Sequence, residues 1–354
     1  MRVRALQVRD LRILEAARLE PGSGINVLWG ANGAGKTSLL EALALLGRGR
    51  SFRDPRGLAL VRRGAGAATV AAEVEGEEGR RERLGLRRDR AGTTVRVEGR
   101  SHRGAGALLG RLPVVWILGE SYQLVEGPPA LRRELLDWGV FHVEPGYAVW
   151  MRRYRRALRQ RNAALRSGDL AAAAAWEAPL AEAAEAVAAA RARYVAGWAE
   201  AVRRLGVRLL AGAEVTLALE PGWRGALAEA LAAGRARDAL LGSTQAGPHR
   251  ADLAVRWAGA EARRLASRGQ ARRLAYALVL GQVLLTRELG REPPVVLVDE
   301  FASELDAAAR AAVLALLREL RVQVWITTTE RAAIPPEAPA AWFHVEQGRV
   351  RPML

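Results

Sequence analysis

The glycine-rich stretch Gly30–Ser38, with the sequence GANGAGKTS, constrains the fold of this chain more than any other feature. It matches the P-loop (Walker A) pattern at every fixed position. The apolar run 25–29 before it predicts a buried strand, and leucines at helical spacing follow it until Gly47. Because strand, loop and helix come in the required order, we prefer a triphosphate-binding loop to a plain glycine-rich turn before a core helix.

Each part of this loop has an expected role in holding a nucleotide. The backbone N–H groups and the helix N-terminus surround the β- and γ-phosphates. Lys36 adds a compact positive charge, and the hydroxyl of Thr37 holds Mg²⁺. Lys36 is the single lysine among 54 lysine and arginine residues, at a position where a planar guanidinium could not replace an ammonium. The expected nucleotide-binding residues of the loop are Gly30, Ala31, Asn32, Gly33, Ala34, Gly35, Lys36, Thr37 and Ser38.

A second motif, of the Walker B type, completes the expected catalytic centre. The apolar run 293–298 predicts a buried strand, and it ends in two adjacent carboxylates, Asp299 and Glu300. We expect Asp299 to hold Mg²⁺ beside Thr37. Glu300 is expected to polarise the attacking water as general base. The alternative, a solvated loop after a core strand, does not explain why charges stand at the end of a buried strand.

Composition narrows the possible partners. The net charge is +16 and the isoelectric point about 11.3, which indicates a polyanionic partner, and we favour nucleic acid over an anionic membrane surface. There are no cysteines, so disulfides and thiolate metal sites are excluded. No apolar run approaches the roughly 20 residues of a membrane span, and the N-terminus begins on a strand pattern, so we expect a cytoplasmic protein without membrane contact.

The order of predicted elements indicates an α/β fold: a discontinuous head, residues 1–120 and 208–354, with a mostly helical arm at 121–207. Two helices of about 20 and 26 residues, joined by a turn at 167–169, form the arm. Arginines crowd the first of these helices between 151 and 161. Phosphate contacts and a merely solvated face explain such a cluster equally well. The expected DNA-binding residues are Arg152, Arg153, Arg155 and Arg156.

The segment 265–270, with the sequence LASRGQ, opens another predicted helix. Ser267 and Gln270 have the spacing of a capping box. The segment also resembles the LSGGQ signature loop of ABC-type ATPases, whose serine contacts the γ-phosphate of a nucleotide held by a second subunit. Walker A precedes it, Walker B follows it, and Ser303-Glu304-Leu305-Asp306 then resembles a D-loop, so the motifs come in the order of an ABC-type ATPase head of mixed sheets and helices.

Three further stretches extend the likeness to one family, at 47–53, 120–137 and 247–253. With the ATPase motifs they span the chain, which resembles the RecF family of bacterial ABC/SMC-like ATPases. The resemblance implies an ATP-dependent homodimer in which two ATP molecules with Mg²⁺ lie between the heads. Lys36, Ser267 (in trans) and Glu300 would then be catalytic, and Ser267, Gly269 and Asp306 would contact the partner's nucleotide.

The resemblance also implies a role in DNA repair and replication. Members of this family bind double-stranded DNA at gaps and single-strand/double-strand junctions, act with RecR and RecO to load RecA, and hydrolyse ATP slowly. The chain departs from the patterns at three points: Gly119 replaces a proline, Ala266 replaces a leucine, and Thr329 replaces the switch histidine of transporters. Glu120 and Gln123 are both candidates for the Q-loop residue. A transporter ATPase subunit and a Rad50/SMC-like DNA tether are the alternatives.

Overall fold

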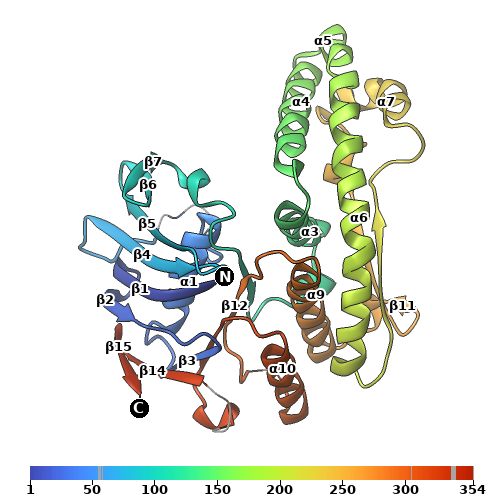
Figure 1. Cartoon of the computed structure of the whole chain (residues 1–354). Coiled ribbons are helices and arrows are strands. Elements are labelled where there is room, and N and C mark those ends of the chain that lie inside the picture. The colour runs from blue at the N-terminus through green and yellow to red at the C-terminus, as the bar shows by residue number, and fades with distance from the viewer. Residues whose placement is uncertain (55–56, 58, 304, 336–339, 354) are drawn as a thin grey trace. The chain divides into compact units, whose positions relative to one another are not determined.

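The computed structural model describes residues 1–54, 57, 59–303, 305–335 and 340–353. It divides into two compact units, Met1–Ser121 with Glu292–Leu354, and Tyr122–Arg291 (Figure 1). The first division lies beside the expected boundary at residue 120. The second lies at 291/292, whereas the sequence suggested that the head resumes at 208. Residues 208–291 therefore group with the helical part of the chain.

An antiparallel sheet forms one layer of the first unit. Its strands, in spatial order, are β2 (Leu14–Leu19), β1 (Arg2–Leu11), β4 (Ala67–Glu75), β5 (Arg81–Asp89), β6 (Gly92–Val97) and β7 (Arg100–Arg103). Buried side chains alternate with more exposed ones along β1, β5 and β6, as expected when one face packs on a core and the other faces solvent. The 3₁₀ helix η1 (Ala105–Leu108) follows β7.

The other sheet of this unit carries the nucleotide motifs. Its order is β15 (Arg349–Met353), β14 (Ala340–Glu346), β3 (Ile25–Trp29), β13 (Val324–Thr328), β12 (Val295–Val298) and β8 (Val114–Ile117). The pairs from β14 to β8 are parallel, so the carboxyl ends of β3, β12 and β13 meet at one edge. β12 and β13 are buried along their whole length, as parallel strands require. Helices α10 (Ala307–Glu319) and η3 (Arg331–Ala333) lie in this part of the chain.

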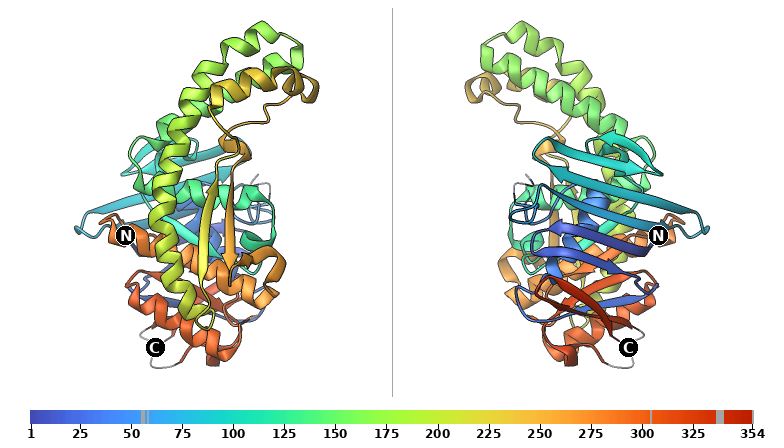
Figure 2. Two further views of the ribbon diagram at one scale, coloured as in Figure 1. Left: turned by 90° about the vertical axis from the view of Figure 1, so that its right-hand side faces the viewer. Right: turned by 90° about the vertical axis from the view of Figure 1, so that its left-hand side faces the viewer.

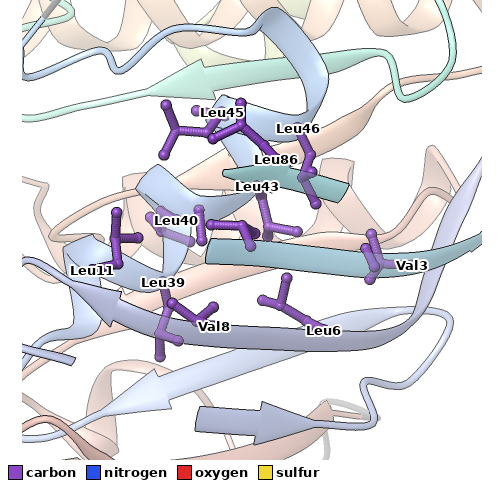
Figure 3. Packing of buried hydrophobic residues seen from close by; sticks show 14 of the residues in the cluster. Val3, Leu6, Val8, Leu11, Leu39, Leu40, Leu43, Leu45, Leu46 and Leu86 are labelled. Carbon is purple, nitrogen blue, oxygen red and sulfur yellow. The ribbon is translucent and has the colours of Figure 1, made fainter. Parts of the chain in front are cut away.

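Helix α1 (Lys36–Arg48) connects the two layers of the first unit. Its leucines Leu39, Leu40 and Leu43 pack with Leu6 and Val8 of the antiparallel sheet (Figure 3). The same cluster includes side chains of the parallel sheet, among them those of β12 and β14. A helix that is apolar all round is stable only when it is buried on all sides. The P-loop helix is therefore fixed from both faces, which fixes the loop at its N-terminus.

The second unit is mostly helical. Its helices are α2 (Gln123–Glu126), α3 (Pro129–Val143), α4 (Tyr147–Ser167), α5 (Leu170–Ala175), α6 (Glu177–Leu209), α7 (Leu227–Leu241), η2 (Pro248–Arg250), α8 (Ala262–Leu265) and α9 (Arg268–Glu288). A small antiparallel sheet of β9 (Val215–Glu220), β10 (Asp252–Trp257) and β11 (Ala260–Glu261) belongs to this unit. Asp169 lies in the turn expected at 167–169, and its side chain caps α5 by accepting a hydrogen bond from the Ala172 N–H.

Close helix packing explains why residues 208–291 join the helical unit. α6 has 33 residues, more than the 26 expected, and lies along α9. A Cβ on Gly281 would lie 2.7 Å from Val202 Cγ2, and one on Gly197 would lie 2.9 Å from Leu285 Cδ1. Glycines at these positions therefore let the two backbones approach closely. β9 to β11 form a sheet of their own rather than extending the sheets of the first unit.

Candidate nucleotide-binding site

The P-loop adopts a conformation that its glycines make possible. Gly33 and Gly35 have φ of 76° and 112°, in the left-handed region where a side chain would be strained. Gly30 has a different constraint, because a Cβ there would lie 2.0 Å from the carbonyl oxygen of Val345. The backbone N–H of Gly348, in the turn between β14 and β15, donates to the Ala34 carbonyl at 2.8 Å. The loop is thus held by its own conformation and by the neighbouring strands.

Lys36 is the first residue of α1 and is only 7% exposed. Its Nζ donates hydrogen bonds to the carbonyl oxygens of Gly30 at 2.8 Å and Ala31 at 2.7 Å. Burial lowers the pKa of the Lys36 ammonium, and the negative charges of Asp299 and Glu300 oppose that shift. The loop therefore concentrates positive charge at the place where the sequence predicted the phosphates.

Asp299 follows β12 and faces the P-loop helix. The Thr37 hydroxyl donates to both Asp299 carboxylate oxygens at 3.1 Å, and the Thr327 hydroxyl donates to Oδ1 at 2.6 Å. A hydroxyl and a carboxylate side by side are the oxygen ligands that Mg²⁺ prefers. The residues predicted for Mg²⁺, Thr37 and Asp299, therefore fit that ion. Sequence reasoning missed Thr327, which β13 brings beside Asp299 through its parallel pairing with β12.

Glu300 differs from its neighbour in being exposed. Its backbone has φ of 52°, an unusual value for a residue with a side chain. The backbone N–H donates to the Thr327 hydroxyl at 2.8 Å, and the carbonyl oxygen accepts from the Ser303 hydroxyl at 2.7 Å. These two bonds hold the strained turn. The role predicted for Glu300 in water activation stays a prediction.

Lys36, Thr37 and Glu300 line a cavity of about 1180 Å³ that lies within the first unit. It also contains four arginines, Arg12, Arg53, Arg62 and Arg63. Arg12 binds the buried carboxylate of Glu41 with two hydrogen bonds of 2.9 and 2.7 Å, and Arg62 pairs with Asp10 at 2.7 Å. Arg53 and Arg63 are exposed and have no acidic partner in the part of the chain that the structure describes. An anionic ligand therefore meets positive charge from several sides.

The other predicted site residues are placed as follows. Ser267 is the exposed N-cap of α9, with the capping box that its spacing predicted, and Gly269 lies in the first turn. Asp306 caps α10 by accepting from the Ala309 N–H at 2.7 Å. Glu304 of the expected D-loop lies outside the described residues. Thr329 follows β13 and lines the cavity.

Comparison with known proteins gives a consistent result. The family model "RecF/RecN/SMC N terminal domain" matches residues 2–345. The "DNA replication and repair protein RecF" of Pseudomonas putida KT2440 is 42% identical over 99% of this chain and 98% of its own length. That of Pseudomonas fluorescens Pf-5 is 41% identical over the same shares. The chain belongs to the RecF family.

Solved structures with a similar fold include a RecF protein and an SMC head domain. The structure of "the recombination mediator protein RecF-ATPrS in RecFOR pathway" has a TM-score of 0.86 at 25% identity, covering 100% of this chain and 98% of its own. An SMC head domain bound to the C-terminal domain of ScpA from Pyrococcus furiosus is similar in fold, with a TM-score of 0.63 at 16% identity, covering 99% of this chain and 95% of its own. The fold is therefore that of a RecF/SMC-type ATPase, as expected.

Two of the RecF-like stretches meet inside the second unit. Arg132 binds the Asp252 carboxylate with bonds of 2.8 and 2.9 Å, and Arg191 joins Asp137 to the carbonyl of Pro248 at 2.7 Å. The stretches 120–137 and 247–253 thus form one ion-paired network that fixes α3 and β10. Their described contacts are structural, and they lie in a unit different from that of the P-loop.

The arginines of helix α4 do not all lie on the surface. Arg152, Arg153, Arg155 and Arg156 are exposed, as expected of a surface that contacts phosphates or solvent. Arg161, which the sequence grouped with them, is fully buried. It donates to Asp238 Oδ2 at 2.7 Å and to Glu177 Oε1 at 3.1 Å, because it lies on the same face as Tyr154. None of the described helices is long and apolar enough to cross a membrane.

Proposed function

We propose that this chain is an ATP-dependent DNA-binding recombination mediator. In this proposal it dimerises on binding ATP, holds duplex DNA near single-strand/double-strand junctions, and helps RecO and RecR to load RecA at gaps. The arrangement of Lys36, Thr37 and Asp299 at one edge of the parallel sheet carries the proposal. Support for the cellular role comes from relatives that are DNA replication and repair proteins.

The first unit supplies the groups for binding and hydrolysis. On nucleotide binding, Lys36 would exchange its bonds to the Gly30 and Ala31 carbonyls for bonds to the β- and γ-phosphates. Thr37 and Asp299 would hold Mg²⁺, which neutralises charge on the phosphates. Glu300 would accept a proton from the attacking water, because its exposed carboxylate stands beside the same cavity. Slow, DNA-stimulated hydrolysis to ADP and phosphate is the expected reaction.

The second unit would complete the site of another copy of the chain. Ser267 is exposed at the N-terminus of α9, a 21-residue helix, so its hydroxyl and the free N–H groups of the first turn are available to an anion. Apart from the backbone of its own helix and its two chain neighbours, no described residue has an atom within 4 Å of the place where a Cβ on Gly269 would stand. We infer that the γ-phosphate of a partner's ATP approaches here, which makes ATP the link between two protomers.

Replacing Ser267 by arginine tests this assignment. The larger side chain should abolish ATP-dependent dimerisation and ATP-dependent DNA binding, while the monomer still binds ATP through its own P-loop. Light scattering with and without ATP gives the mass, and fluorescence of a labelled ATP analogue gives the affinity. The control is Ser167→Arg, which adds the same group to an exposed serine at the end of α4. Dimer formation by Ser267→Arg would refute the assignment.

The exposed arginines of α4 are the proposed DNA contacts of the second unit. Arg152, Arg153, Arg155 and Arg156 flank the buried Tyr154 on both sides, and they have no acidic partner among the described residues. Unpaired arginines on a rigid helix can neutralise phosphates and release counterions. These guanidinium groups are therefore available to a DNA backbone.

A double variant that removes two positive charges, Arg152→Gln/Arg156→Gln, should weaken duplex binding and flatten its salt dependence. Each lost phosphate contact removes about 0.9 from the slope of log K against log salt. Arg203→Gln/Arg204→Gln removes the same charge from arginines that are paired with Glu200 and Glu288, and it should leave the slope unchanged. If the two variants have equal salt slopes, the α4 arginines do not contact phosphates and form only a solvated surface.

A further inference from the structure

The outer face of strands β5, β6 and β7 carries a second cluster of arginines. Residues that pair across an antiparallel sheet point to the same side, so the register defines this surface. Val95, Leu84 and Leu86 point inward and are buried. The outward side chains of these strands include Arg81 and Asp89 at the ends of β5, and between them a group that we call the β5–β7 face: Arg83, Gly85, Arg87, Thr94, Arg96, Ser101 and Arg103.

The register spaces the arginines evenly. Arg87 pairs with Thr94, which pairs with Arg103, so the two arginines lie two strands apart, about 10 Å. Arg96 pairs with Gly85 on one side and with Ser101 on the other. It is therefore a diagonal neighbour of Arg87 and Arg103, at about 7–8 Å. Between the arginines stand only small side chains, so the surface is flat and its cations are accessible.

This surface carries an excess of positive charge, and most of its arginines have no acidic partner among the described residues. The β5–β7 face contains four arginines, Arg83, Arg87, Arg96 and Arg103, and no carboxylate of its own, with Asp89 next to it at the end of β5. Arg87 pairs with Asp89 at 3.1 Å, and Glu98 accepts a hydrogen bond from the backbone of Arg83. Within the described residues Arg83, Arg96 and Arg103 have no acidic partner, and all three are exposed. The antiparallel sheet of the first unit lies face-on in the right-hand view of Figure 2.

We propose that the β5–β7 face binds the phosphate backbone of duplex DNA, independently of ATP. Guanidinium groups are suited to phosphate, and flat, evenly spaced cations match a regular polyanion. The face presents no aromatic side chain on which unpaired bases could stack, which disfavours single-stranded DNA as its ligand. It also presents no apolar side chain to anchor an acidic protein segment. Binding here is therefore expected to be salt-sensitive and independent of sequence.

This inference rests on the proposed DNA-binding function but extends it, because the face belongs to the first unit and needs neither nucleotide nor a second protomer. The experiment uses the full chain as Lys36→Met without nucleotide, so that the ATP-dependent mode is absent. Anisotropy of a short labelled duplex of mixed sequence is measured over a range of salt concentrations. Arg87→Gln/Arg96→Gln/Arg103→Gln is added to this background.

The control is Arg318→Gln/Arg349→Gln/Arg351→Gln, which removes the same charge from exposed arginines of α10 and β15. We expect the face variant to lose at least tenfold in affinity and about 0.9 of salt slope per lost contact, while the control changes little. Equal losses in both variants would overturn the proposal in favour of a net-charge effect. Equal affinity of the face for polyglutamate would overturn it in favour of an acidic protein segment.

These outcomes separate the inference from the proposed function. If the ATP-dependent binding of the wild-type chain persists while the face variant binds like its control, only the second DNA surface is refuted. If the face variant loses binding in the Lys36→Met background but the wild-type chain shows no response to ATP, the clamp proposal fails and the β5–β7 face stands.

Discussion

Lys36→Met is expected to weaken ATP binding by on the order of 100-fold or more, because charge-assisted hydrogen bonds to phosphate contribute about 1.5–3 kcal/mol each. The methionine chain has similar length and fits the same buried path, so the fold should persist. ATP-dependent dimerisation and ATP-dependent DNA binding should be lost together with the nucleotide. Isothermal titration with ATP and Mg²⁺ measures the first effect, and light scattering measures the second.

The control for this prediction is Lys36→Arg, which keeps the charge. A guanidinium is larger and planar, and the ammonium fits between the Gly30 and Ala31 carbonyls, so arginine should also bind ATP poorly. Wild-type affinity should fall as pH rises, beginning below the usual lysine range, because burial lowers the pKa of Lys36 and ATP needs the charged form. Tight ATP binding by Lys36→Met would show that the loop does not act as a P-loop.

Glu300→Gln should reduce ATP hydrolysis by about 100-fold or more, the range typical of a lost general base. Glutamine keeps the size and the hydrogen bond from the backbone N–H to Thr327, so ATP binding should remain. The ATP-bound dimer should therefore accumulate and release DNA more slowly than the wild-type chain. Single-turnover hydrolysis and the rate of DNA dissociation after ATP addition measure the two effects.

The matched control for Glu300→Gln is Glu330→Gln, an exposed carboxylate that follows β13 in the same unit. It should hydrolyse ATP at the wild-type rate. If Glu300→Gln also turns over normally, the proton acceptor is another group and Glu300 only shapes the turn. A loss of ATP binding in Glu300→Gln would instead show that the carboxylate is needed to bind ATP rather than to hydrolyse it.

The nucleotide site was predictable from the sequence where its parts are contiguous. The P-loop and the strand that ends in Asp299 and Glu300 are local patterns, and each specifies its own backbone. Thr327 was not predictable, because its contact with Asp299 depends on the pairing of Val298 with Ile326 in parallel strands. Strand register of that kind is decided by the whole sheet rather than by a local run of residues.

In the helical unit, too, local features were predictable from the sequence and long-range packing was not. α4 and the capping of α5 followed from periodicity and from Asp169. Arg161 was predictable in retrospect, since it stands seven residues after the buried Tyr154 and therefore on the same helix face. The assignment of residues 208–291 was not, because it depends on the packing of α6 along α9, two helices about 60 residues apart in sequence.

If each ATP site is built from two copies of the chain, mixing two inactive variants should restore activity. Lys36→Met lacks a working P-loop and Ser267→Arg lacks a working signature loop, but a dimer of one of each retains one intact composite site. We expect the mixture to hydrolyse ATP in the presence of duplex DNA, while each variant alone does not. Activity of the mixture no greater than the mean of the two variants would contradict it.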